Sequence, residues 1–97
     1  MAVTVTVMPR VQVAAKKLPM SEARILADFI RLVVLNGANP NSAASTAHAH
    51  SNAVKEKDKK LAFTGTNELV ITHNRAFYKL TGQALIITNI VPVEETP

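Results

Sequence analysis

The chain has 97 residues, 47% of them hydrophobic, which is enough for one packed core but not for two. We therefore expect a single domain over residues 1–97. Cysteine is absent, so disulfides, thiolate metal sites and a cysteine nucleophile are excluded. The net charge of +4 favours acidic partners weakly, and the sequence shows neither a signal peptide nor an apolar run long enough to span a bilayer.

The N-terminal segment alternates valine with threonine over residues 2–8, which is the period of a half-buried strand. Pro9 interrupts this alternation, and Val11 and Val13 resume it around a glutamine. We expect either one strand broken at Pro9 or two short strands that meet at a bend, with Pro9 on a sheet edge.

The segment of residues 21–36 is the one long stretch with helical periodicity. Ile25, Phe29 and Leu32 form an apolar row, and Gly37 follows where a helix would end. The opposite side carries the charged residues Glu22, Arg24, Asp28 and Arg31. We expect one amphipathic helix that covers a sheet.

Residues 38–60 are rich in alanine, serine, asparagine, histidine and lysine and contain few apolar side chains. Pro40 blocks continuation of the preceding helix, and Ser42 is a candidate N-cap for another. Two interpretations stay open, namely a surface helix or a long polar arm or insertion that projects from the domain.

The remaining chain predicts strands separated by turns that contain glycine or asparagine, at residues 61–64, 68–73, 76–81 and 84–91. The last of these is the most apolar and is expected at the sheet centre. The predicted fold class is therefore α+β, with one helix packed on a mostly antiparallel sheet of four to six short strands.

The predicted strands carry more apolar surface than one helix can cover. Residues 84–91 have apolar side chains on both faces, and so does the run Leu69, Val70 and Ile71. The second face must be covered by the sheet curling on itself or by another chain, and we favour another chain.

Three histidines are the candidate metal ligands. His48 and His50 would share one side of a strand, and His73 ends another predicted strand. The pair resembles the histidine-x-histidine pairs that bind a metal around the threefold axis of trimeric viral fibre tips. Without a nearby carboxylate or cysteine, the favoured interpretation is two exposed histidines in a polar segment. No cofactor is expected.

No catalytic arrangement is recognisable. The carboxylates belong to the helix surface, a lysine-rich cluster, a strand start or the C-terminal tail, and no serine lies in a Gly-x-Ser-x-Gly turn. The three glycines are too far apart to form a phosphate-binding loop. We expect that the chain is not an enzyme.

Basic side chains are the candidate contacts to nucleic acid. They form short patches rather than a continuous stripe, so solvated surface charge is the favoured interpretation. The candidates are Lys16, Lys17, Lys55, Lys57, Lys59, Lys60, Arg75 and Lys79.

The leading functional hypothesis is a non-enzymatic structural or interaction protein that acts in a homo-oligomer or in a hetero-assembly with other structural proteins. By analogy, a small phage virion component, such as a head, neck or tail accessory protein, matches this profile. The alternative is a small basic nucleic-acid-binding protein. The expected location is the cytoplasm or the virion, with no membrane partner.

Overall fold

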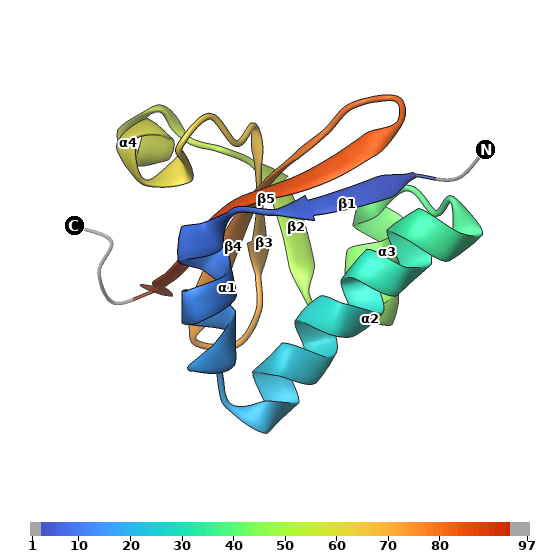
Figure 1. The fold of residues 1–97 in the computed structure, drawn as a ribbon, viewed down its shortest axis with the longest axis horizontal. Helices are drawn as coiled ribbons and strands as arrows, with labels where there is room; N and C mark the ends of the chain where they lie inside the picture. The colour runs from blue at the N-terminus through green and yellow to red at the C-terminus, as the bar shows by residue number, and fades with distance from the viewer. Residues whose placement is uncertain (1–2, 94–97) are drawn as a thin grey trace.

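Five strands form one mixed sheet within residues 3–93, which are the residues that the computed structural model describes (Figure 1). The order across the sheet is β1-β5-β4-β3-β2. The strands are β1 Thr4–Val7, β2 His50–Ala53, β3 Asn67–Val70, β4 Asn74–Leu80 and β5 Ala84–Pro92. The expectation of one domain over residues 1–97 extends to residues 1, 2 and 94–97, which lie outside the described part.

The first and last strands lie side by side. β1 runs parallel to β5, with Val5 opposite Leu85, whereas the other neighbouring strands are antiparallel. A parallel pair needs a long connection, and here nearly the whole chain forms it. Figure 1 shows β1 in blue beside β5 in orange.

Helices cover both faces of the sheet. Figure 1 shows α1, α2 and α3 on one side and α4 on the other. Their bounds are α1 Pro9–Lys16, α2 Met20–Asn36, α3 Pro40–Thr46 and α4 Lys59–Ala62, and α4 follows directly on the 3₁₀ helix η1 Glu56–Asp58. The α+β class is therefore confirmed, with four α-helices in the described residues where the sequence predicted one helix and left a second open within residues 38–60.

The larger core lies between α2 and the sheet. Phe29 of α2 is fully buried against Tyr78 of β4, and the two ring centroids lie 5.3 Å apart. Leu85 and Ile87 of β5 complete the same core. The helical stripe read from the sequence thus packs where it was expected, because its apolar residues recur at 3.6-residue spacing.

The second face of the sheet has a smaller core that the chain forms by itself. Ala62, Phe77 and Val91 are buried there, and Leu61 and Val54 pack against them. Thr88 Oγ1 donates to the carbonyl oxygen of Ala62, which fastens α4 to β5. Within the described residues, α4 therefore covers part of the face for which the sequence analysis favoured another chain.

The strand predicted at Val11 and Val13 is wrong, because these residues belong to helix α1. Pro9 occupies the first turn of α1, where its missing N–H costs nothing and its fixed φ suits a helix. Val11 is 1% exposed, whereas Val13 is 57% exposed. The two valines therefore do not share one buried face, as they would on a half-buried strand.

The strand predicted at residues 61–64 is also wrong. Lys59–Ala62 is the short helix α4, and Phe63 and Thr64 follow with φ values of 47° and 72°. A run of four residues is too short for its pattern to separate helix from strand.

Residues 38–60 contain several short elements, namely α3, β2, η1 and the start of α4, and they form neither one helix nor an unstructured arm. Asn39 Oδ1 accepts a hydrogen bond from the N–H of Asn41 at 2.9 Å and so caps α3. β2 then pairs with β3 and forms one edge of the sheet. No helix in residues 3–93 is long and apolar enough to cross a membrane.

Candidate functional site

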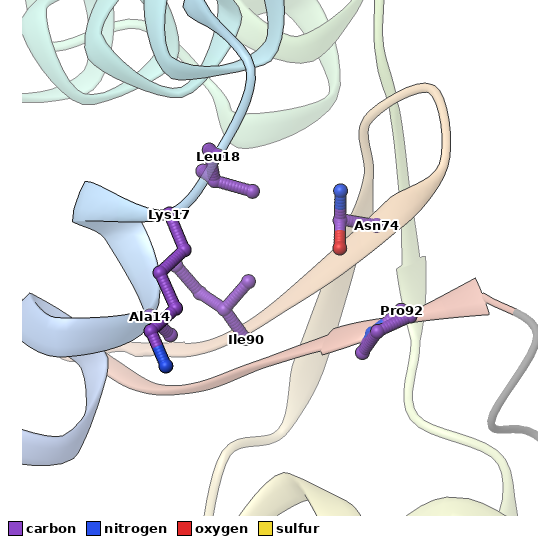
Figure 2. A pocket seen from close by; sticks show the side chains of 6 residues that line it. All are labelled: Ala14, Lys17, Leu18, Asn74, Ile90 and Pro92. Atoms are coloured by element: carbon purple, nitrogen blue, oxygen red, sulfur yellow. The ribbon is translucent and has the colours of Figure 1, made fainter.

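A pocket of about 250 Å³ opens between the end of α1 and the ends of two sheet strands. Figure 2 shows Leu18 and Ile90 approaching it from opposite sides, with Asn74 on a third side. The residues that line it are Ala14, Lys17, Leu18, Asn74, Ile90 and Pro92. Most of this lining is apolar, and Lys17 is its one charged side chain.

The helical wall of the pocket is set by the C-terminus of α1. The N–H of Lys17 donates to the carbonyl oxygen of Ala14 at 3.0 Å, and the N–H of Leu18 donates to that of Ala15 at 3.2 Å. These bonds close the last turn before the chain leaves for α2. Leu18 then packs against the main core, which fixes its position in the wall.

The sheet wall of the pocket is fixed by Glu22 in the first turn of α2. Glu22 is 2% exposed, and its Oε1 accepts from the N–H of His73 at 2.8 Å and from Asn74 Nδ2 at 3.0 Å. The N–H of Val93 donates to the carbonyl oxygen of His73 at 2.9 Å. Hydrogen bonds therefore fix both walls of the pocket: the helical wall through Lys17 and Leu18, and the sheet wall through Glu22. Sequence reasoning placed Glu22 on the solvated face of the helix and so missed this contact.

A buried ionic cluster lies on the other face of the sheet. Arg75 Nη1 donates to Asp58 Oδ2 at 3.1 Å and to Glu68 Oε2 at 3.0 Å, and all three side chains are nearly inaccessible. The guanidinium also lies over the ring of Phe77, 5.1 Å from its centroid. The cluster ties η1 to β3 and β4 in a region where water cannot screen the charges.

Arg75 therefore does not lie on the surface, where a phosphate contact would need it. Asp58 and Glu68 appeared as solvated charges in the sequence, because nothing local marks them as partners of an arginine on another strand. The seven other candidate basic residues are exposed: Lys16, Lys17, Lys55, Lys57, Lys59, Lys60 and Lys79. Four of them lie just before or within η1 and α4, two at the end of α1 and one on β4.

The three histidines are exposed and lie on different segments. His48 precedes β2 with a φ of 65°, His50 begins β2, and His73 lies in the connection from β3 to β4. Among residues 3–93, no three histidine, cysteine, aspartate or glutamate side chains gather as a metal site would require.

Tyr78 of β4 is a titratable side chain that is 1% exposed. Its ring lies in the main core, and its hydroxyl shares a hydrogen bond with Ser51 Oγ on β2. Burial disfavours the tyrosinate and raises the pKa of Tyr78 above its ordinary value of 10.0, and the hydrogen bond to Ser51 opposes part of that shift.

Comparison with known proteins finds likeness in solved structures alone. No protein-family model and no curated protein sequence matches the chain. The chain resembles one in the crystal structure of the archaeal RelE-RelB complex from Pyrococcus horikoshii OT3, with a TM-score of 0.65 and 14% identity over 98% of this chain and 99% of that chain. It also resembles one in the toxin-antitoxin complex RelBE2 from Mycobacterium tuberculosis, with a TM-score of 0.51 and 16% identity over 95% of this chain and 99% of that one.

These neighbours share the fold along nearly the whole chain, and they correct the functions expected from the sequence. Both belong to toxin–antitoxin pairs. The expected phage virion component and the alternative of a small basic nucleic-acid-binding protein are therefore both wrong. The likeness extends over nearly the whole chain, and no short motif in the sequence indicates it.

Proposed function

We propose that this chain is the toxin member of a toxin–antitoxin pair and that it binds a cognate antitoxin protein. The observation that carries the proposal is the match of 98% of this chain to 99% of the Pyrococcus chain. Fold alone does not fix function, so the remaining support comes from how the core is built.

The core favours the toxin over the antitoxin. Phe29, Phe77 and Leu85 are 0% exposed although no second chain is present to cover them. A toxin acts after its antitoxin has gone, so it has to remain folded alone. A chain whose largest apolar side chains are buried within itself meets that requirement.

The proposed antitoxin partner is more specific than the kinds of assembly expected from the sequence. A homo-oligomer or an assembly with structural proteins was expected, and the proposal instead names a hetero-complex of two different chains. The expectation that the chain is not an enzyme stays a prediction, because the proposal concerns growth inhibition and its relief by a binding protein, whatever the chemistry of the inhibition.

Inducible expression in a bacterial host tests the proposal. The chain is expressed alone and then together with each reading frame that flanks its gene, and viable cells are counted after induction. The expected result is loss of viability with the chain alone and recovery with one flanking product that co-purifies with it. A frame-shifted copy of the gene controls for the burden of induction.

Two outcomes would contradict the proposal. The first is unchanged growth while soluble, folded chain accumulates in the cells. The second is a chain that is harmless alone but protects cells from a toxic flanking product, which would make it the antitoxin.

A further inference from the structure

We propose that the pocket at the end of α1 is the anchor site for the partner protein, and that it takes an aliphatic side chain flanked by acidic residues. This inference rests on the proposed function, because it names where and by what chemistry the antitoxin is held. It goes further in predicting a short linear feature of the partner that can be tested without knowing the partner's sequence.

The size of the pocket suits side chains better than a small-molecule ligand. Its volume is about 250 Å³, below the range of about 300–1,000 Å³ that is usual for small-molecule and cofactor sites. It is nevertheless several times the share of about 30 Å³ that one water molecule takes in the liquid. One or two aliphatic side chains would fill such a volume, as anchor residues do in protein–protein interfaces.

The apolar lining is already in place before anything binds. Leu18 and Ile90 pack against the main core, and Ala14 belongs to the same packed layer. Asn74 is fixed by its bond to Glu22 Oε1 at 3.0 Å. A wall that does not have to reorder on binding leaves more of the contact free energy for affinity.

The charge at the rim selects an acidic neighbour for that apolar group. Lys17 lines the pocket, Lys16 precedes it, and both side chains are exposed. The nearby carboxylate of Glu22 is buried at 2% exposure and engaged with His73 and Asn74, so it does not offset the lysines at the surface. With a net charge of +4 on the chain, acidic residues beside the anchor would find complementary potential.

Exposed apolar side chains precede and follow Lys17 in the chain. Val13 lies one turn earlier in α1 and is 57% exposed, and Met20 at the start of α2 is 79% exposed. Neither contributes to the core as it stands. A partner segment that extends from the pocket over either side chain would remove it from water, which would add apolar burial to the anchor contact.

Peptide titration followed by ¹⁵N–¹H NMR tests the inference directly. The probe is acetyl-Glu-Glu-Leu-Leu-Glu-Glu-amide, and the two controls replace its leucines with serines or its glutamates with lysines. The expected result is saturable shifts of the Ala14, Lys17 and Leu18 amides with the probe, and affinities at least about tenfold weaker with either control. Shifts that are equal for all three peptides, or that map elsewhere, would overturn the inference.

Two substitutions separate the pocket from the rest of the surface. Ala14→Trp fills the pocket, and Lys17→Glu reverses the rim charge, whereas Lys55→Glu makes the same charge change in the segment before η1. We expect about tenfold or greater weakening of probe binding by the first two variants and less than about twofold by the third. Matching NMR spectra away from the substitutions establish that each variant is folded. Equal affinity of Ala14→Trp and wild type would contradict the inference.

The same variants distinguish a failure of this inference from a failure of the proposed function. If the chain is a toxin and the pocket holds the antitoxin, Ala14→Trp still arrests growth but the flanking product no longer restores it. Restored growth with Ala14→Trp would leave the toxin assignment standing and remove the pocket from it. Absence of arrest by folded wild type would remove the toxin assignment, while the peptide titration would still decide what the pocket binds.

Discussion

Tyr78 is the only tyrosine of the chain, and tryptophan is absent, so this one side chain reports on the main core without interference. Its ring packs on Phe29, and its hydroxyl reaches Ser51 on the edge strand β2. The residue therefore links α2, the sheet interior and the sheet edge. Its ionisation has to disturb all three, because a tyrosinate at this position would carry its charge into apolar surroundings.

We predict that Tyr78 titrates above pH 10.0 in the folded protein, because burial raises its pKa. The folded state then holds the proton more tightly than the unfolded chain. The stability that this contributes is complete below pH 10.0 and is lost as the pH rises through the folded pKa. Ultraviolet absorbance of tyrosinate measures the midpoint.

Two variants control this prediction. Ser51→Ala removes the hydrogen bond that lowers the pKa, so its midpoint should lie higher than that of the wild type. Tyr78→Phe should lose the part of the high-pH decline in unfolding free energy that Tyr78 causes. A wild-type midpoint at or below 10.0 would show that the hydroxyl is not buried as described.

A second prediction concerns the contribution of Arg75 to the stability of the fold. Replacement by methionine leaves Asp58 and Glu68 buried without the guanidinium that bonds to both. We expect Arg75→Met to lower the free energy of unfolding by about 3–5 kcal/mol, measured by urea denaturation followed through Tyr78 fluorescence. Lys79→Met removes an exposed cation from the same strand and should change stability by about 0.5 kcal/mol or less. Similar losses in the two variants would contradict a buried ionic cluster.

This cluster also shows what a sequence cannot reveal about single residues. Asp58 and Glu68 are separated from Arg75 by 17 and 7 positions, so their contact exists only after β3, β4 and η1 have come together. Before folding, all three have the ordinary appearance of surface charges. The same holds for Glu22, whose hydrogen-bond partners His73 and Asn74 lie 51 and 52 positions away.

At the scale of elements, the predictable parts were those with a long or unbroken periodicity. Helix α2 extends over Met20–Asn36, close to the predicted residues 21–36, because several turns repeat the same apolar stripe. The strand β5 at Ala84–Pro92 matches the predicted residues 84–91 equally well. Helices α1 and α4 were missed because each is short and has few buried residues, so tertiary packing rather than pattern decides their conformation.

Gly65 tests the packing of α4 on the sheet. A Cβ atom at this position would lie 2.6 Å from Thr88 Oγ1 and 3.1 Å from the carbonyl oxygen of Ala62. We expect Gly65→Ala to lower the free energy of unfolding by about 1–3 kcal/mol, because either α4 or β5 has to move. Urea denaturation measures the change.

Gly82 provides the matched control. A Cβ atom at this position would have no neighbouring atom within 4 Å, and the backbone there is not left-handed. Gly82→Ala should therefore leave stability unchanged or raise it by up to about 1 kcal/mol, through the lower entropy of the unfolded chain. An equally harmless Gly65→Ala would mean that α4 does not pack closely on β5.

At the scale of the whole molecule, the topology was the part that no local pattern could supply. The pairing of β1 with β5 joins the two ends of the described chain, and β2 comes from a segment that resembled a polar arm. The covering of the second sheet face by α4 follows from this arrangement. The functions expected from the sequence were corrected by the fold of the whole chain, because it is this fold that the chain shares with proteins of toxin–antitoxin complexes.

The topology predicts one cooperative unfolding transition. The sheet contains both ends of the described chain and the strand β2 from its middle, and α2 packs on it through Phe29, so we expect the sheet and its helices to unfold together. Urea curves from Tyr78 fluorescence and from far-ultraviolet circular dichroism should coincide. A chain that lacks residues 40–58 should fail to show the transition, since it loses α3, β2 and the Asp58 carboxylate. Two separated transitions in the full chain would contradict a single domain.

We propose that this chain acts as a toxin and remains folded without its partner. The most direct measurement is the count of viable cells after induction of the wild-type chain alone, beside induction of Arg75→Met at matched expression. We expect loss of viability with the wild type and recovery with the destabilised variant. Unchanged viability of the wild-type culture, with soluble folded chain in the cells, would contradict the proposal.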